Sequence, residues 1–468
     1  MFNRIVMFFI FYVCTLQLHA QHISPASIRE ETYLNGTWDF KSNASGEWTT
    51  IQVPGCYSIL RDGKWNAAYW DPFGYPHSWT GRGAVYRKKV HISPSMENKH
   101  LTLHMGGCLQ HYTVIFDGKE FPEVHDGYTT AEFSLGTGFK TGEYLLEIRI
   151  SEEKSWLNGG ESDGFRGIWQ DVYLKATDLV FVSKGIFVQT SFPDKSIQVE
   201  VPVSNSGKMP REVSVRCFVT DVGNPSKVIK EIGVAKQFLK GKDSVILKLS
   251  TQWSDPHLWF PHDPHLYQLH TVISDPNGKQ LDWHKQVFGF RTISWDGPNL
   301  YINGRKLYLR GHGGHFLGDI QGSKEYFVTW FKELKKLGVN FMRLHLYPRQ
   351  AALYEAADEV GFLLESEPAF HFKVPEDQEF AKKNIWVILL LISEIILQSS
   401  CGACLMNSDG VVVAKNPGLL NMPKNLILPG LYFLQISASF PLQEICWGII
   451  TITIPCLQNG KSMDTISQ

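Results

Sequence analysis

The sequence predicts a multidomain protein that is mainly β over roughly its first two thirds and α/β after that. A length of 468 residues suggests about three domains, because single domains contain roughly 100 to 200 residues. Short runs of alternating apolar and polar residues, broken by turn residues, extend from about Tyr33 to Ile293, and strands then alternate with helices. The 14 Trp, 29 Phe and 40 Gly residues also favour β-rich domains with many turns.

The first twenty residues have the pattern of a secretory signal peptide. Arg4 precedes an apolar run from Ile5 to Leu16, and Leu18-His19-Ala20 offers neutral or small residues for cleavage, so we expect the mature chain to start near Gln21. An uncleaved membrane anchor is the alternative, but the run is shorter than the roughly 20 apolar residues that a span needs. We therefore expect a secreted or periplasmic protein whose mature chain has no membrane span.

Net charge and cysteine content limit the partners and the cross-links that the sequence predicts. The formal net charge of -1 gives no electrostatic reason to expect a nucleic acid or a membrane surface as partner. Cys56, Cys108 and Cys217 are spread thinly over the patterned part of the chain, so no disulfide framework is predicted. No cofactor is expected, and the oligomeric state stays open.

Two β-sandwiches are predicted before residue 294. In the first, over residues 21–178, the stretch "YTVIFDGKEF" places Asp117-Gly118 as a hairpin turn between two alternating runs. In the second, over residues 179–293, "SIQVEVPVSN" and "REVSVRCFVT" repeat the alternation across about 100 residues, the size of an Ig-like domain. Such patterns are typical of antiparallel sandwiches.

After residue 293 the pattern predicts the opening of an α/β domain, over residues 294–383. "YINGRKLYLRGHGGH" indicates a hairpin that leads into a strand, and "VNFMRLH" and "FLLESE" indicate two more strands. The first helix is expected between Ser323 as N-cap and Gly338 as C-cap, and the second from Pro348 to Gly361. The expected buried face of the first helix comprises Phe327, Trp330, Phe331, Leu334 and Leu337. Strands that alternate with helices imply parallel pairing.

Ionisable residues follow these three strands at the ends where α/β proteins carry their chemistry. They are His312 and His315, then Arg343 and His345, then Glu365 and Glu367. One such residue alone is more often a surface residue or a satisfied buried one. Three consecutive strands that end in this way predict the floor of a polar site.

Several stretches in order resemble family 2 of the glycoside hydrolases, which contains β-galactosidases, β-glucuronidases and β-mannosidases. The resemblance covers roughly residues 34–370 and rests on "YLNGTWDF", "GAVYRKKVHI", "GFRGIWQDVYL", "DPHLWFPHDPHLYQL" and "INGRKLYLRGHGGH". It implies a jelly-roll sugar-binding domain, an Ig-like domain and a (β/α)8 TIM barrel, of which this chain holds an incomplete first part with three β/α units. A full barrel needs about 250 residues.

The resemblance also implies a glycan substrate and hydrolysis of β-glycosidic bonds with retention by two glutamates, whose carboxyl groups stand about 5 to 5.5 Å apart. Arg343 matches the family's strand-2 arginine, which orients the nucleophilic carboxylate. His315 matches a barrel histidine near the sugar, and Glu367 the acidic residue that closes strand 3. The commoner family pattern has a histidine three residues after the arginine. Here Leu346 holds that place and His345 precedes it, which weighs against a β-galactosidase.

The two catalytic glutamates are missing. No Asn-Glu pair follows Glu367, no Arg follows Arg349, and the composition shifts after Lys383. Reading the third base of each codon with the first two of the next permits the family's strand-4 motif "RNHPSVVMWSLSNE" over residues 393–407, and Met406-Asn407 forces its final Glu. We infer a shift of reading frame between about residues 380 and 383, with residues 384–468 translated out of frame and not natively folded. The chain as written is then expected to be catalytically inactive.

Two alternatives stay open. A non-catalytic carbohydrate-binding protein would use the tryptophans of the first sandwich, Trp65, Trp70, Trp79 and Trp169, to stack on sugars. An adhesion module would use the two sandwiches alone. A metal or redox site at Cys401 and Cys404 lacks a second ligand pair at the required spacing, so no metal is expected.

Overall fold

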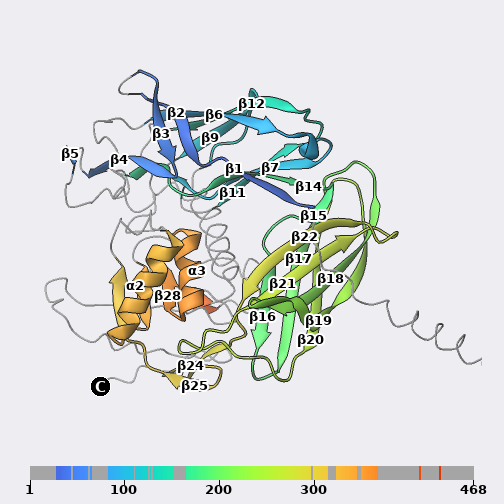
Figure 1. Cartoon of the computed structure of the whole chain (residues 1–468), viewed down its shortest axis with the longest axis vertical. Coiled ribbons are helices and arrows are strands. Elements are labelled where there is room, and N and C mark those ends of the chain that lie inside the picture. Colours follow the sequence, from blue (N-terminus) through green and yellow to red (C-terminus); the bar gives the residue numbers. More distant parts are fainter. Residues whose placement is uncertain are drawn as a thin grey trace, which may run out of the picture.

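The computed structural model describes residues 28–43, 46–61, 64–65, 83–109, 111–124, 127, 130–151, 165–296, 299–314, 323–344, 349–366, 411–412 and 432–433. These form, in chain order, a first β-sandwich, a second β-sandwich and an α/β unit with two helices (Figure 1). This order confirms the predicted fold class. The expected signal peptide lies outside the described residues, and so does the expected out-of-frame tail apart from the short strands β29 (Val411–Val412) and β30 (Tyr432–Phe433). The domain boundaries stay predictions.

Three sheets build the first sandwich. Its strands are β1 (Glu30–Tyr33), β2 (Gly36–Ser42), β3 (Thr49–Val53), β4 (Gly55–Arg61), β5 (Lys64–Trp65), β6 (Ala84–Ile92), β7 (His100–Met105), β8 (Cys108–Leu109), β9 (Tyr112–Phe116), β10 (Lys119–Glu120), β11 (Ala131–Gly136), β12 (Gly142–Ile150), β13 (Phe165–Ile168) and β14 (Val172–Thr177). Sheet A has the order β1-β14-β7-β11, sheet B the order β10-β9-β12-β6-β2-β3, and sheet C the order β5-β4-β13-β8.

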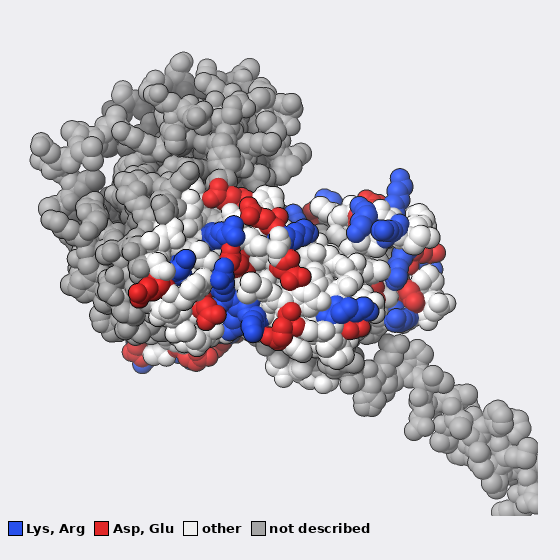
Figure 2. All heavy atoms as spheres, turned by 90° about the horizontal axis from the view of Figure 1, so that it is seen from above, with Lys and Arg blue, Asp and Glu red and all other residues white. Residues whose placement is uncertain are grey.

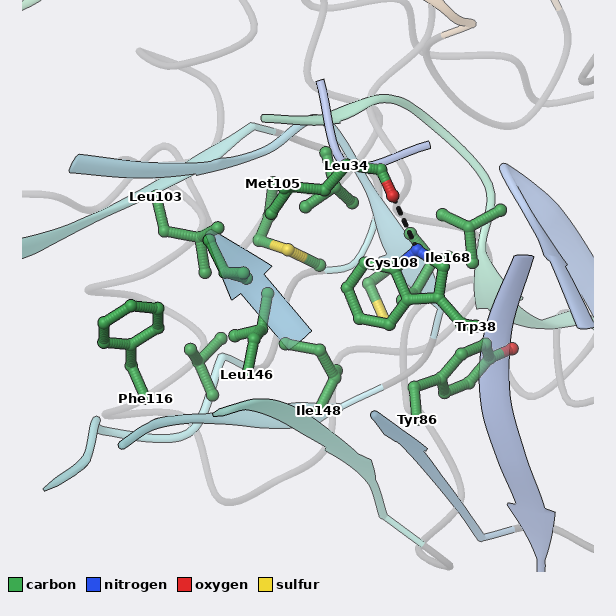
Figure 3. Close-up of a cluster of buried hydrophobic side chains, with 14 of the residues drawn as sticks. Leu34, Trp38, Tyr86, Leu103, Met105, Cys108, Phe116, Leu146, Ile148 and Ile168 are labelled. Atoms are coloured by element: carbon green, nitrogen blue, oxygen red, sulfur yellow. Dashed lines mark hydrogen bonds between the residues drawn. The ribbon is translucent and has the colours of Figure 1, made fainter. Parts of the chain in front are cut away.

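The core of this sandwich lies between the inward faces of its strands. Leu101, Leu103 and Met105 of β7 lie two residues apart and therefore share one face of the strand. This face points into the core, and all three side chains are fully buried. Figure 3 shows this core, in which the indole Nε1 of Trp38 donates a hydrogen bond to the carbonyl of Leu34 at 2.7 Å. The predicted hairpin at Asp117-Gly118 joins β9 to β10 and is confirmed, since both residues have the positive φ that such a turn needs.

The second sandwich packs two antiparallel sheets. Its strands are β15 (Val180–Val182), β16 (Phe187–Ser191), β17 (Ser196–Asn205), β18 (Arg211–Asp221), β19 (Asn224–Leu239), β20 (Asp243–Gln252), β21 (Tyr267–Ser274) and β22 (Gln280–Phe288). One sheet has the order β15-β17-β16, with β20 also paired to β17, and the other the order β19-β18-β21-β22. The predicted alternation is clear in β17, whose buried apolar residues are Ile197, Val199, Val201 and Val203.

The α/β unit begins with a three-stranded antiparallel sheet and continues with a parallel sheet. Its elements are β23 (Ile293–Asp296), β24 (Asn299–Ile302), β25 (Arg305–Leu307), β26 (Gly311–Gly314), α2 (Lys324–Lys336), β27 (Phe341–Leu344), α3 (Ala351–Val360) and β28 (Leu363–Ser366). Strands β26, β27 and β28 pair in parallel, as predicted. The helices cover one face of this sheet (Figure 1).

Two helix predictions need correction at the ends. Ser323 is the N-cap of α2 and accepts from the backbone N–H of Tyr326, as expected, but the C-cap is Leu337, and Gly338 follows it with a φ of 83°. Leu337 is 80% exposed rather than buried. It stands about 80° around the helix from Phe327 at 3.6 residues per turn, and therefore at the edge of the apolar face. Helix α3 starts at Ala351 with Gln350 as N-cap, not at Pro348.

The three parts are joined by specific polar contacts. Arg29 forms an ion pair with Asp282 of the second sandwich at 2.6 Å. The indole Nε1 of Trp259 donates to the carbonyl of Asp358 in α3 at 3.1 Å. Lys335 of α2 donates to the carbonyls of Pro261 at 2.5 Å and Val360 at 2.6 Å.

The surface mixes both signs of charge. On the face shown in Figure 2, Lys and Arg side chains lie among Asp and Glu side chains, in keeping with the formal net charge of -1. Within the described part of the chain, no helix is both long and apolar enough to span a membrane.

Candidate functional site

The parallel sheet sorts its side chains onto two faces. Met342 and Leu344 of β27 and Leu364 of β28 are fully buried and pack with Phe327 and Phe331 of α2 in one apolar cluster. Residues one position away on each strand must point to the opposite face, which is the interior side of a barrel built from such units. That opposite face therefore carries the candidate site.

The interior face is apolar at the start of the strands and polar one step further. Phe341 and Leu363 belong to a cluster with Trp259, Leu300 and Ile302, which come from the second sandwich and the β24 strand. This cluster seals the end of the sheet from which the parallel strands begin. The polar groups on this face therefore lie beyond it, toward the carboxyl ends of the strands.

Arg343 and Glu365 stand side by side on this face. In the sheet register, Arg343 is paired with Gly313 of β26 on one side and with Glu365 of β28 on the other. Paired residues of parallel strands project to the same face, and neighbouring strands lie about 4.8 Å apart. Both side chains are half-buried. A guanidinium beside a carboxylate at this position can hold and orient a polar ligand or a further carboxylate.

His312 does not belong to this row. Its register partner is Met342, which pairs in turn with Leu364, and both of these residues face the helices. The ring of His312 meets that of Trp330 of α2 edge-on with centroids 6.3 Å apart. The structure therefore separates His312 from Arg343 although both stand near strand ends. Three further predicted site residues, His315, His345 and Glu367, lie outside the described residues.

A hydrogen-bonded network, missed by the sequence patterns, links α3 to the end of β28. The backbone N–H of Arg349 donates to the hydroxyl of Tyr354 at 3.2 Å, and this hydroxyl shares a hydrogen bond of 2.9 Å with the hydroxyl of Ser366. The side chain of Arg349 is almost fully buried at 3% exposure. This network fixes the start of α3 against the strand end that carries Glu365. The sequence signals were a tyrosine inside a helix and an arginine before it, which are too common to identify a network.

The tryptophan proposed for sugar stacking in the first sandwich is core. Trp169 is 2% exposed, and its Nε1 donates to the carbonyl of Gly127 at 2.9 Å. A β-carbon at Gly107 would lie 2.5 Å from that Nε1, so the backbone packs tightly against the indole. Trp169 therefore cannot stack on a sugar, which removes one of the four tryptophans on which the carbohydrate-binding alternative depends. The side chains of Trp65, Trp70 and Trp79 lie outside the described residues.

A metal centre finds no support in the part of the chain that the structure describes, where no group of three or more His, Cys, Asp or Glu side chains could hold an ion. Cys401 and Cys404 lie outside it. Cys56, Cys108 and Cys217 are buried. Burial raises the pKa of the Cys108 thiol and raises that of Cys217 to about 11, so these two thiols are poor nucleophiles in the folded protein.

Comparisons with known proteins agree on one family. Residues 180–291 match the model described as glycosyl hydrolases family 2, and residues 294–381 match the model of the TIM barrel domain of that family. A β-galactosidase of Halalkalibacterium halodurans is 25% identical over 396 residues, which are 75% of this chain and 38% of that protein. A β-glucuronidase of Bacteroides fragilis is 24% identical over 385 residues, which are 76% of this chain and 51% of that protein.

A solved structure extends the similarity to the fold. The crystal structure of a β-glucuronidase of Bacteroides uniformis has a TM-score of 0.68 to this chain at 20% identity, and the match covers 82% of this chain and 46% of that one. The chain thus spans about half or less of the length of these three relatives.

Proposed function

The chain belongs to family 2 of the glycosyl hydrolases, and we therefore propose that it derives from a retaining β-glycosidase that acts on a glycan. The observation that carries this proposal is the interior row of the parallel sheet, where Arg343 and Glu365 stand in register beyond an apolar seal. Retaining hydrolysis needs a nucleophilic carboxylate held in a fixed orientation. A half-buried arginine can supply this with two parallel hydrogen bonds.

The remaining predicted site residues are assigned roles by resemblance. His315 is proposed to contact the sugar and Glu367 to close the third strand as a further polar group. His345, at which the chain departs from the commoner family pattern, is proposed only as a residue that supports the site. No metal or other cofactor has a step in this mechanism, because the two carboxyl groups perform acid, base and nucleophilic work between them.

The chain as written is proposed to be inactive because both catalytic glutamates are missing. Without them no group remains to form the glycosyl intermediate or to protonate the leaving oxygen. The match to the family's barrel model ends at residue 381, close to the inferred shift of reading frame between residues 380 and 383, although the chain continues to residue 468. This agreement supports the frame-shift hypothesis independently of the codon argument.

Hydrolysis assays test the proposal. The chain as written and a version with the reading frame restored would be purified and assayed with aryl β-glucuronides, β-galactosides and β-mannosides. We expect turnover of at least one substrate by the restored protein and none by the chain as written. Turnover by the chain as written would refute the proposal that it is inactive. A restored protein that folds but hydrolyses no β-glycoside would refute the proposal that it derives from a β-glycosidase. Glycan binding without hydrolysis would instead favour the carbohydrate-binding alternative.

Arg343 offers a sharper test in the restored protein. Arg343→Met should lower kcat by about two orders of magnitude or more, since a positioned charge of this kind contributes several kcal/mol in the transition state. Arg343→Lys should recover only part of the loss, because an ammonium cannot form the two parallel bonds. Arg216→Met, which removes an exposed arginine paired with Glu231 in the second sandwich, should leave kcat unchanged.

Export is proposed from the first twenty residues. Expression in a Gram-negative host followed by mass spectrometry of the N-terminal peptide should find a mature chain that starts near Gln21. An intact Met1 in the exported fraction would contradict this proposal.

A further inference from the structure

The outer face of sheet A is polar and yet largely buried, because it packs against the second sandwich. We call this contact the sheet A interface and define it by His100 and Lys175 on sheet A and by Phe181, Asp282 and His284 on the second sandwich. The imidazole of His100 stacks on the ring of Phe181, with centroids 5.0 Å apart and an angle of 20° between the planes. His100 is 6% exposed, Lys175 5% and Asp282 0%. Ionisable side chains are rarely buried to this extent.

One ion pair fastens the interface. The guanidinium of Arg29 donates from Nη2 to Oδ2 of Asp282 at 2.6 Å and from Nε to Oδ1 at 3.2 Å, and its Nη2 also reaches the carbonyl of Val182 at 2.9 Å. The backbone N–H of Val182 donates to the same carboxylate at 2.8 Å. Fixed donors therefore satisfy the buried charge of Asp282, as such a charge requires.

Cations surround the two histidines of the interface from several elements. Lys175 of β14 and Lys242, from the turn between β19 and β20, both act on His100. Arg29 and Lys175 act on His284, where Asp282 and Glu132 oppose them. Glu132 of β11 is itself engaged, because it accepts from Lys175 at 2.7 Å and lies 3.3 Å from Nδ1 of His104. An added positive charge on either histidine would therefore be poorly compensated.

Each of these histidines also has a ring nitrogen without a partner. Nδ1 of His100 and Nδ1 of His284 are buried and make no hydrogen bond to any described residue. The buried hydroxyl of Thr177, which is paired with His100 in the strand register, also makes no hydrogen bond to any described residue. Burial and the neighbouring cations lower the pKa of His100 to about 4. Burial and Arg29 lower the pKa of His284 to about 3. Both rings are neutral while the interface is closed.

We propose that the sheet A interface is an acid-released contact, at which protonation of His100 and His284 separates the first sandwich from the second. The closed form excludes the charged imidazoles, and the open form exposes them to water, where they titrate as ordinary histidines. A histidine whose pKa is lowered in the closed form stabilises the closed form fully while the pH is above the ordinary pKa of histidine. This stabilisation is lost as the pH falls below that value. The window runs from about 6.5 down to about 4 for His100 and about 3 for His284.

The size of the effect follows from linkage. At pH 5 each histidine favours the open form by about thirtyfold relative to neutral pH, because the pH then lies about 1.5 below the ordinary pKa and above that of the closed form. The two together raise the opening equilibrium by about a thousandfold between pH 7.5 and pH 5. This device is independent of the proposed hydrolytic activity and is present in the chain as written.

Labelling of histidines with diethyl pyrocarbonate, read by peptide mass spectrometry on the full chain, tests the proposal. The side chain of His91 is 60% exposed and serves as the reference for the intrinsic rate at each pH. His270 is 1% exposed inside the second sandwich, where it bonds to Thr220 at 2.9 Å, and it reports unfolding of that domain. Relative to His91, we expect labelling of His100 and His284 to rise up to about a thousandfold between pH 7.5 and pH 5, with His270 still protected.

Variants separate the proposal from general acid instability. His100→Gln should shrink the rise at His284 to about thirtyfold, since one titrating group remains, and Arg29→Gln should raise labelling of both already at pH 7.5. His265→Gln, which removes a histidine that pairs with Asp221 instead, should change neither. Protection of His100 and His284 down to pH 5, or labelling of His270 together with them, would overturn the proposal.

Discussion

Replacement of Gly361 by alanine tests how the α/β unit is held on the second sandwich. Gly361 ends α3 in the left-handed conformation, with a φ of 76°, which costs a residue with a β-carbon about 1 to 2 kcal/mol. A β-carbon there would also lie 2.4 Å from the carbonyl oxygen and 2.9 Å from the carbonyl carbon of Pro261. Both are backbone atoms, so the segment around Pro261 must move away from α3.

That movement breaks the contacts that the segment makes. Pro261 accepts from Lys335, and its neighbour Trp259 donates to Asp358 of α3, and each such hydrogen bond is worth about 1 kcal/mol net. Together with the backbone strain, Gly361→Ala should destabilise the α/β unit by about 3 to 4 kcal/mol. A urea titration with pulsed hydrogen exchange of α3 peptides should then show a midpoint lower by about 1 to 2 M.

Gly338→Ala is the matched control. Gly338 follows α2 with a φ of 83°, and a β-carbon there would meet only the side chain of Arg310 at 3.7 Å, an ordinary contact. This variant carries the backbone strain alone and should lower the midpoint by about 0.5 M. Equal shifts for the two variants would refute the reasoning that the Pro261 segment is docked against the end of α3.

Three further predictions concern buried charges and thiols. Arg29→Gln leaves the fully buried carboxylate of Asp282 without its cation and should lower the free energy of unfolding by about 3 to 5 kcal/mol in urea titrations. Lys248→Gln removes the exposed partner of the ion pair with Glu200 and should change the free energy of unfolding by less than about 1 kcal/mol. Comparable losses for the two variants would contradict this prediction. Cys217 should resist iodoacetamide at pH 8 in the folded protein and react in urea, because burial raises its pKa to about 11; stoichiometric labelling of the folded protein would show the thiol to be accessible. Burial raises the pKa of Glu132, but hydrogen bonds from His104 and Lys175 and the charge of Lys175 outweigh burial and lower the pKa to about 2. This carboxylate thus contributes stability above its ordinary pKa of 4.5 that is lost as the pH falls toward 2, and Glu132→Gln should flatten that part of the unfolding profile; an unchanged profile would speak against it.

Local patterns predicted the features that local chemistry decides. The Asp117-Gly118 hairpin, the cap at Ser323 and the end of α3 at Gly361 all follow from residues within a few positions of each other. The predicted burial of Leu337 was wrong. Its apolar side chain fits the helical pattern, but it lies at the end of α2, beyond the part of the helix that is packed against the sheet.

Contacts between distant segments could not be predicted in this way. Arg29 and Asp282 are 253 positions apart, and the residues around either one give no sign that the two form an ion pair. The sequence alone does not decide whether Trp169 stacks on a sugar or fills the core, and its packing against Gly107 shows that it is core. Arg343 was singled out from the sequence, but its neighbour on the interior face is decided by strand register, which also sent His312 to the helical side.

We propose that this chain carries the first part of a β-glycosidase from which a shift of reading frame removed the catalytic glutamates. Sequencing of the source DNA across codons 375 to 410, with translation of all three frames, tests it most directly. We expect a single missing or extra base between codons 380 and 383, after which the restored frame runs on through an Asn-Glu pair. An unbroken reading frame that encodes the present sequence, with stop codons in both alternative frames across this region, would contradict the proposal.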